Sequence, residues 1–488
     1  MIKFILNDQD ITTDQPAGMT VLDFVRYHKD LKGTKIGCRE GDCGACTVLV
    51  GELVGGEVKY RSMTSCLMPL ANTAGKHIVT IEGINPEDCG LTPVQQAMVD
   101  ESGTQCGFCT VGFVMSLTGF CLDGSAKTPE QAVSAIDGNI CRCTGYKSIE
   151  RAAASISNLM SEPGARATGL SPVVPPYFAD IPKRLAHMVN ERPPNDGTQN
   201  VFVGGGTDVY VQKHDAMAEA DANHLFDDPE LRTISETGTH IEIGSSVTVT
   251  DLLESPLINA IFPDRYKHLK LVSSTPIRNM ATLAGNFVNA SPIGDMTVWF
   301  LALDAEITLS SVAGVRTGSG SDRVLPLRDL YLGYKQLAKT EDEYITAIRF
   351  RKPTGDFRFN FEKVCKRTYL DIASVNTAIS LTVRSAPGDT WLPPALSEPG
   401  APTGSLVTYT VESAHVAAGG VSPIPLYLRK TSDFLVGKIV NEDTISQANE
   451  IMQSEISPIS DVRGTEQYKR LLLRQLFTAH FVELFGRN

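Results

Sequence analysis

The stretch GCREGDCGACTVLVG, residues 37–51, decides the fold of the N-terminal part of this 488-residue chain. It sets Cys38, Cys43 and Cys46 in a C-x4-C-x2-C pattern, and Cys66 follows after nineteen intervening residues. Glycines stand between and beside these thiols, where they let a loop turn tightly and aim its backbone N–H groups at sulfur. The spacing therefore predicts a loop wrapped around a compact metal site, held by four thiolates.

The same spacing is that of a plant-type [2Fe-2S] ferredoxin. On either side of the loop, residues 2–7, 47–50 and 57–60 alternate between apolar and polar side chains, as strands do. Thr20 can cap a helix over residues 21–28. We therefore expect a small β-grasp domain whose first cluster is ligated by Cys38, Cys43, Cys46 and Cys66.

A second group of four cysteines follows, Cys106 and Cys109 in one pair and Cys141 and Cys143 in another. Helical patterns lie beside both pairs, so two pairs of helices can present two thiolates each. The expected signals are Thr92-Pro93 at the start of one helix, residues 110–122 as a second, and Thr128-Pro129 with Gln131 as the capping box of a third that Gly138 ends.

Two cysteine pairs can also make a tetrahedral zinc site, so the second group alone leaves structural zinc open. Directly after a ferredoxin-type loop, however, the eight cysteines resemble those of the molybdenum hydroxylases, the xanthine dehydrogenase family. That resemblance implies a ferredoxin-like domain followed by an all-helical [2Fe-2S] domain, which lies closer to the molybdenum cofactor. The other cysteines, Cys89, Cys121 and Cys365, are expected to be small buried hydrophobic residues.

Beyond a Pro-, Gly- and Ser-rich stretch at 161–182, two segments suggest a nucleotide site. Residues 202–211, FVGGGTDVYV, carry three consecutive glycines that can expose backbone N–H groups to a phosphate. Residues 278–295, RNMATLAGNFVNASPIGD, mix small and polar side chains that can admit a pyrophosphate and ribose. Neither segment spells G-x-G-x-x-G, so a dinucleotide Rossmann fold is not predicted.

In this order and at this separation, the two segments resemble the vanillyl-alcohol-oxidase-type FAD domain of xanthine dehydrogenases and of carbon monoxide dehydrogenase medium subunits. The resemblance implies that the FAD pyrophosphate is cradled by Val203, Gly204, Gly205, Gly206, Thr207, Asp208 and Val209. It implies that ribose and phosphate oxygens are held by Thr282, Gly285, Asn286, Asn289, Ser291 and Asp295.

The same resemblance implies roles in flavin binding for two further residues. Lys363 would supply a cation beside a reduced, anionic flavin, although a solvated lysine explains it equally well. Ile345 would pack on the flavin, although a buried strand isoleucine explains it equally well. The family often carries two adjacent acids before its Ile-Ala step, whereas here Leu370 precedes Asp371, which bears on how NAD would bind.

Composition limits the function further. A net charge of −12 without a Lys/Arg block argues against nucleic-acid or membrane-surface binding. No signal peptide or long apolar run is evident, so we expect a cytoplasmic protein. The nine histidines form no HExxH motif, and no nucleophile with an oriented base is recognisable. We therefore expect the chemistry to reside in cofactors.

The fold class expected is multidomain α+β, in four domains. These are a ferredoxin-like domain over 1–84, an all-helical [2Fe-2S] domain over 85–160, an FAD-binding domain over 183–354 and a C-terminal flavoprotein domain over 355–488, with a linker over 161–182. Strands at 373–383 and 407–412 and helices at 442–456 and 467–485 are predicted in the last.

The resemblance implies an electron-transfer subunit with two [2Fe-2S] clusters and FAD. A separate molybdopterin-binding subunit would oxidise hypoxanthine and xanthine to urate, in a dimer of heterodimers, and NAD would accept the electrons. Alternatives keep this role for an aldehyde or another N-heterocycle hydroxylase, or make the chain a stand-alone NADH-oxidising reductase. A different class, a non-catalytic zinc-binding regulatory or assembly protein, also stays open.

Overall fold

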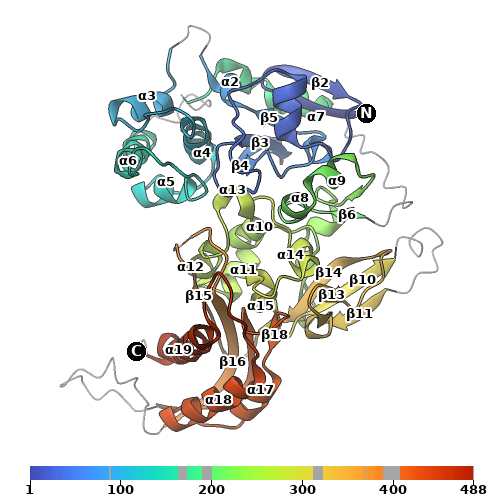
Figure 1. The fold of residues 1–488 in the computed structure, drawn as a ribbon, viewed down its shortest axis with the longest axis vertical. Helices are drawn as coiled ribbons and strands as arrows, with labels where there is room; N and C mark the ends of the chain where they lie inside the picture. The colour runs from blue at the N-terminus through green and yellow to red at the C-terminus, as the bar shows by residue number, and fades with distance from the viewer. Residues whose placement is uncertain are drawn as a thin grey trace. The chain divides into compact units, whose positions relative to one another are not determined.

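The computed structural model describes residues 1–86, 90–162, 173–188, 201–311, 322–367, 369–387 and 407–486 (Figure 1). They divide into two compact units. The first comprises Met1–Asp227, Thr248–Thr250 and Ser273–Thr282, and the second comprises Asp228–Val247, Asp251–Val272 and Leu283–Asn488. Within the described residues, no helix is long and apolar enough to span a bilayer.

The first unit begins with a five-stranded sheet in the order β2-β1-β5-β3-β4. Its strands are β1 (Ile2–Leu6), β2 (Gln9–Thr13), β3 (Thr47–Val54), β4 (Glu57–Thr64) and β5 (His77–Val79). The β1–β5 pair is parallel and the other pairs are antiparallel. The predicted cap is confirmed, because the Thr20 hydroxyl accepts from the Asp23 N–H at the start of α1 (Val21–Asp23). The helix then continues as a π-helical turn, η1 (Phe24–His28).

A helical bundle follows in the same unit, formed by α2 (Ile81–Ile84), α3 (Pro93–Asp100), α4 (Thr110–Leu122), α5 (Pro129–Ala135) and α6 (Lys147–Ser161). Thr92 and Gln95 form a reciprocal capping box at the start of α3, which fixes that helix as predicted. Helix α4 is buried over Gly112–Cys121 and forms the centre of this core. Gly138 was predicted to end α5, but the helix already ends at Ala135, with Ile136 as its C-cap.

The rest of the first unit is built from short elements. They are the 3-10 turns η2 (Leu70–Thr73) and η3 (Pro176–Ala179), the helices α7 (Ile181–His187), α8 (Val209–Gln212), α9 (His214–Glu219) and α13 (Thr275–Arg278), and the parallel strand pair β6 (Phe202–Val203) and β7 (Asn223–His224). In the stretch 161–182, residues 163–172 lie outside the described part of the chain. Its C-terminal portion holds η3 and the start of α7.

The second unit contains an antiparallel sheet in the order β11-β10-β14-β9-β8. The strands are β8 (Ile234–Thr237), β9 (His240–Gly244), β10 (Glu306–Ser311), β11 (Arg323–Pro326) and β14 (Glu343–Arg351). Other elements around them are η4 (Glu230–Arg232), η5 (Leu327–Asp329), β12 (Tyr331–Gly333) and β13 (Gln336–Leu337), with the helices α10 (Val249–Glu254), α11 (Pro256–Ile261), α12 (Arg265–Lys270), α14 (Leu283–Asn289) and α15 (Asp295–Leu301).

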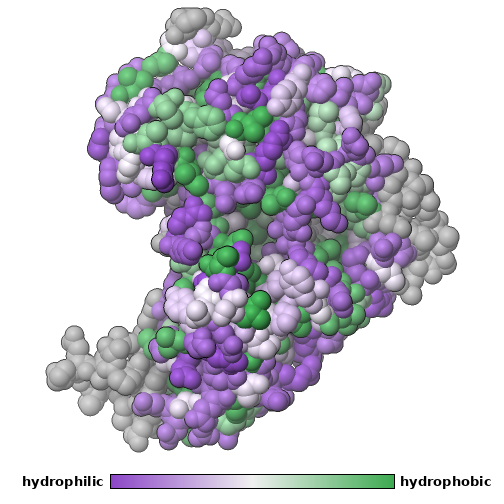
Figure 2. All heavy atoms as spheres, viewed as in Figure 1, coloured by the Kyte–Doolittle hydropathy of each residue, from purple (hydrophilic) through white to green (hydrophobic). Residues whose placement is uncertain are grey.

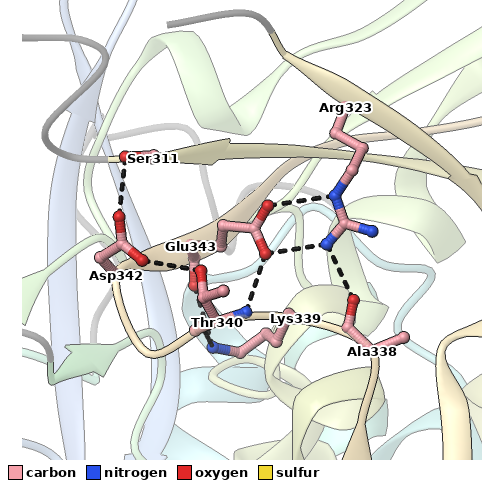
Figure 3. Close-up of polar contacts among 7 residues, drawn as sticks. All are labelled: Ser311, Arg323, Ala338, Lys339, Thr340, Asp342 and Glu343. Carbon is pink, nitrogen blue, oxygen red and sulfur yellow. Dashed lines mark hydrogen bonds and ion pairs between the residues drawn. The ribbon is translucent and has the colours of Figure 1, made fainter.

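Charged and hydroxyl side chains fix the edge of this sheet where β14 begins (Figure 3). Arg323 binds the Glu343 carboxylate through two nitrogens, at 3.2 and 2.8 Å. The same carboxylate accepts the Thr340 N–H at 2.8 Å, and the Ser311 hydroxyl donates to Asp342 at 2.9 Å. The turn before β14 is therefore tied to both β10 and β11.

A second sheet in this unit has the order β15-β16-β17-β18, all antiparallel. Its strands are β15 (Asp356–Val364), β16 (Val375–Pro387), β17 (Val407–Gly419) and β18 (Leu426–Tyr427). Helices α17 (Arg429–Leu435), α18 (Glu442–Glu455) and α19 (Glu466–Phe485) complete it, and their buried side chains join those of the sheet in one core. The strands and helices predicted here are present, and the multidomain α+β fold class is confirmed.

Candidate redox sites

The first four cysteines lie together in two pairs of hydrogen-bonded thiols. Cys38 bonds to Cys43 and Cys46 bonds to Cys66, and Cys38 also interacts electrostatically with both members of the second pair. Cys46 and Cys66 are buried. The hydrogen bond between Cys38 and Cys43 lowers the pKa of the Cys38 thiol to about 5 and raises that of Cys43, so one thiolate of this pair is favoured.

Backbone N–H groups of the loop point at these sulfurs. The Glu40 N–H lies 3.3 Å from the Cys38 sulfur, the Ala45 N–H bonds to Cys43, and the Gly41 N–H bonds to Cys66. The loop is also tight at Gly37, where an added Cβ would lie 2.5 Å from the Cys43 sulfur. Hydrogen bonds to sulfur stabilise the negative charge of thiolates, so this loop suits a thiolate-bound centre.

The second four cysteines also meet in pairs. Cys109 bonds to Cys141, and Cys106 bonds to Cys143. Cys141 is buried and also accepts the Thr144 N–H at 3.5 Å, whereas Cys106 and Cys143 are exposed. Burial raises the pKa of Cys109 to about 12. Among the described residues, no three His, Cys, Asp or Glu side chains converge on one point as ligands of a single ion would.

The two cysteine loops touch each other directly. The Ile140 N–H, next to Cys141, donates to the Cys43 carbonyl at 3.1 Å. The neighbouring Asn139 side chain donates to the Gly44 carbonyl at 3.2 Å and accepts the Ser116 hydroxyl at 2.8 Å. One backbone and one side-chain hydrogen bond therefore join the loop that carries Cys43 to the loop that carries Cys141.

Residues predicted to bind FAD occur in both units. In the first unit, Gly204, Gly205 and Gly206 are packed so closely that side chains would clash. An added Cβ would lie 2.6 Å from the Thr282 hydroxyl at Gly204 and 1.7 Å from the Met280 carbonyl at Gly205. Gly206 has a φ of +85°, which favours glycine. The three glycines therefore let the turn Val203–Val209 pack closely against Met280 and Thr282.

In the second unit, Asp295 and Lys363 form a buried ion pair, with Nζ of Lys363 at 2.7 Å from Oδ2 of Asp295. Lys363 also donates to the Leu271 carbonyl at 2.8 Å, and its side chain is 1% exposed. Its positive charge is therefore already paired in this structure. The other oxygen of Asp295 accepts Asn376 Nδ2 at 2.6 Å.

Asn376 was not predicted, although it holds the loop around Asp295. Besides Asp295, Nδ2 of Asn376 lies 3.2 Å from the Ile293 carbonyl. Opposite it, Gly419 leaves room for this contact, since a Cβ there would lie 2.2 Å from Oδ1 of Asn376. That oxygen is buried without a partner among the described residues, so the loop contains an acceptor free to take a donor.

The remaining predicted flavin residues have local roles. Asn286 accepts the Thr297 N–H and hydroxyl, both at 3.0 Å, which ties α14 to α15. Asn289 accepts Nζ of Lys335 at 2.9 Å, and Ser291 accepts the Ile293 N–H. Gly285 is exposed. Ile345 is a buried residue of β14.

The loop after β15 contains Leu370 and Asp371, where the sequence differs from the two adjacent acids that the family often carries. Leu370 has a φ of +75°, which is unfavourable for a leucine, and Asp371 binds the guanidinium of Arg367. Cys365, just before, is only half-buried, so its prediction as a buried hydrophobic residue is wrong. Cys121 is buried as predicted, and Cys89 lies outside the described residues.

Comparison with known families agrees with this arrangement. The 2Fe-2S iron-sulfur cluster binding domain matches residues 4–71, and the [2Fe-2S] binding domain matches 80–154. The FAD binding domain in molybdopterin dehydrogenase matches 181–353, and the CO dehydrogenase flavoprotein C-terminal domain matches 361–484. Together these domains define an iron-sulfur flavoprotein of the oxidoreductase class.

Several relatives that match almost the whole chain are xanthine dehydrogenases. Xanthine dehydrogenase 1 of Arabidopsis thaliana is 26% identical over 97% of this chain and 39% of its own length. Xanthine dehydrogenase of Emericella nidulans is 29% identical over 90% of this chain and 35% of its own length. The chain is similar to these xanthine dehydrogenases over most of its own length, and it spans about two fifths of the length of these curated relatives.

Solved structures with a similar fold were also found. Carbon monoxide dehydrogenase from Hydrogenophaga pseudoflava is 22% identical, with a TM-score of 0.47, over 57% of this chain and 86% of that one. Quinoline 2-oxidoreductase from Pseudomonas putida 86 is 21% identical, with a TM-score of 0.47, over 58% of this chain and 88% of that one.

Proposed function

We propose that this chain is the electron-transfer subunit of a xanthine dehydrogenase, passing electrons from a molybdopterin-binding partner subunit through two [2Fe-2S] clusters to FAD and then to NAD. The partner would oxidise hypoxanthine and xanthine to urate, in a cytoplasmic dimer of heterodimers. The observation that carries the proposal is the pairing of eight thiols in two groups, whose loops are joined by the Ile140–Cys43 hydrogen bond.

The thiol pairing fits two-iron centres. A [2Fe-2S] cluster takes four thiolates, two on each iron. The pairs Cys38–Cys43 and Cys46–Cys66 would then hold the two irons of the first cluster. The pairs Cys109–Cys141 and Cys106–Cys143 would hold those of the second.

The flavin residues of each unit fit their proposed roles as well. The turn Val203–Val209 has three consecutive glycines, whose backbone N–H groups carry no side chains and would suit a pyrophosphate. Asp295 is fixed by Lys363 and Asn376, and a fixed carboxylate can accept ribose hydroxyls. When bound, FAD would exchange single electrons with the clusters and a hydride with NAD. Ion pairing with Asp295 leaves Lys363 a positioning residue rather than a free cation.

Two alternatives differ in the partner or in the class of protein. The same chain could serve a hydroxylase of aldehydes or other N-heterocycles, or act alone as an NADH-oxidising reductase. A regulatory or assembly protein would instead hold zinc at the cysteines and bind no flavin. Metal content separates the last of these from the others.

The first experiment is a visible spectrum of the aerobically purified chain, with iron, zinc and released flavin quantified per polypeptide. We expect four irons, one FAD and almost no zinc, from two four-thiolate clusters and one flavin site. Broad absorption should bleach with dithionite. Stoichiometric zinc without flavin would overturn the proposal.

The substrate and the acceptor are tested next with the co-purified complex. Xanthine should bleach the chromophores only when the molybdopterin subunit is present, and NADH should reduce the flavin of this chain alone. Bleaching of the complex by an aldehyde but not by xanthine would favour the alternative hydroxylase.

A further inference from the structure

Arg39, the residue after the first cysteine, makes a salt bridge that the proposed electron route does not use. Its guanidinium donates to both carboxylate oxygens of Asp23, with Nη2 at 2.6 Å from Oδ1 and Nη1 at 3.0 Å from Oδ2. Nη1 also lies 3.0 Å from Nε2 of His214 in α9. Because a guanidinium only donates, Nε2 of His214 is the acceptor in this contact.

The Asp23 carboxylate is itself held in place. The Thr20 hydroxyl donates to its Oδ2 at 2.7 Å, and Thr20 is also the N-cap of α1. The side chains of Arg39 and Asp23 are only 31% and 20% exposed. The first turn of α1 therefore fixes the acceptor to which the cysteine loop is tied.

The backbone at Arg39 is unfavourable for an arginine. Its φ is +58°, in the left-handed region that favours glycine. This conformation lies between Cys38 and Glu40, whose N–H points at the Cys38 sulfur at 3.3 Å. A strained residue persists where its surroundings over-determine it, and the two-pronged contact with Asp23 supplies such a restraint.

The charge of Arg39 also reaches the thiols. Arg39 interacts electrostatically with Cys66, so a cation lies near one buried thiol of the first group. Reduction potentials of iron-sulfur clusters depend on net charge and on hydrogen bonds to sulfur. Since adding one electron makes the site more negative by one charge, a nearby cation favours reduction and a nearby carboxylate opposes it.

We propose that Arg39 and Asp23 form a tuning pair for the first cluster. Arg39 supplies positive charge near the Cys66 thiolate, and Asp23 offsets part of that charge and holds the loop that carries Cys38. This inference rests on the proposed function, because it requires a cluster at these cysteines. It assigns Arg39 and Asp23 as positioning residues that set a potential.

The test measures the reduction potentials of both clusters in the full chain, by dithionite titration with mediators followed by electron paramagnetic resonance. Asp23→Asn leaves the guanidinium uncompensated and should raise the potential of the first cluster. Arg39→Gln leaves the carboxylate alone and should lower it. Arg39→Lys keeps the charge and should stay closer to wild type than Arg39→Gln does.

The second cluster is the internal control, and its potential should not move. Asp356→Asn is the matched control variant, because Asp356 accepts two bonds from Arg358, both at 3.0 Å, in the C-terminal sheet. It should leave both potentials unchanged. If Arg39→Gln does not retain iron, then Asp23→Asn and Arg39→Lys decide the question.

Unmoved potentials in iron-loaded variants would overturn this inference alone. Shifts of the same sign in Asp23→Asn and Arg39→Gln would overturn it too, as would equal shifts of the two clusters. A wild-type chain without iron would overturn the proposed function instead, so the two failures are distinguishable.

Discussion

At the scale of single residues, the cysteines follow from the sequence because ligand spacing is a local property of the chain. The loop at Gly37–Gly51 carries three of the thiols within one short segment of the chain. The contact between Asn376 and the loop at Asp295 could not be predicted in this way, because it joins residues far apart in the sequence. The only local signal is a polar side chain in the buried stretch of β16.

Replacing one cysteine should remove one cluster only. We expect Cys43→Ser or Cys141→Ser to lower the iron content from about four to about two per chain, because each cluster needs four thiolates. Cys365→Ser is the control, since this half-buried thiol belongs to neither group. Iron quantification on the purified variants checks the prediction, and loss of iron from the control would contradict it.

Replacing Asp295 should cost both stability and flavin. In Asp295→Ala, Lys363 is left buried without its ion-pair partner, which destabilises by about 3–5 kcal/mol. Urea unfolding measures this change, and flavin fluorescence during titration of the apoprotein with FAD should show weaker binding. Glu236→Ala breaks the exposed pair with Lys352 and should cost less than about 1 kcal/mol. Equal losses in the two variants would contradict the prediction.

At the scale of elements, polar groups link α12, α19 and the C-terminal sheet inside the core. Nε2 of His268 donates to Oδ1 of Asn360 at 3.0 Å, and Nδ2 of Asn360 donates to Nδ1 of His480 at 3.0 Å. These contacts fit neutral imidazoles, because in a protonated His480 the Nδ1–H donor would face the Nδ2 donor of Asn360. Burial lowers the pKa of His268 to about 4 and that of His480 to about 3.

This pair should make the second unit sensitive to acid. Unfolded histidine takes up a proton near pH 6.5, whereas the folded groups do so only near their lowered pKa values. The unfolded state therefore binds more protons as the pH falls from about 6.5 to about 4, and stability falls with it. We expect His480→Gln to show a smaller difference in urea midpoint between about pH 7 and about pH 5 than wild type. Exposed His187→Gln is the control and should keep the wild-type difference.

Some boundaries of helices could be predicted from the sequence and others could not. The capping residues Thr20 and Thr92 act on the next turn of their own helices, so their effect is local and was predicted. The π-helical turn after α1 and the early end of α5 have no such local signal. They depend on how each helix packs against its neighbours.

At the scale of the whole molecule, polar side chains cover much of the visible face, with apolar ones scattered among them (Figure 2). Large apolar residues beside the second cysteine group are partly exposed, namely Phe108 at 46%, Tyr146 at 39% and Ile140 at 37%. Exposed apolar side chains beside a redox centre suit contact with a protein partner. The proposed molybdopterin subunit would dock there.

A charge in this apolar group should weaken the complex without removing the clusters. We expect Phe108→Asp to reduce co-purification of the partner subunit, with about four irons still present per chain, because a charge would be buried at the interface. Val54→Asp, at an exposed position on the β3–β4 hairpin, should leave co-purification unchanged. Full retention of the partner by iron-loaded Phe108→Asp would exclude this docking face.

The hydrogen bonds from Asn139 and Ile140 to the loop of the first cysteines also bear on how the protein is made. Each loop is shaped partly by the other, so a nascent chain that has received only one cluster should keep its second loop incompletely formed. Maturation then becomes a cooperative process, in which delivery of iron and sulfide to one loop prepares the other. In the wild-type chain, where both sets of four cysteines are intact, half-loaded forms should accordingly be rarer than independent loading of the two sites would give.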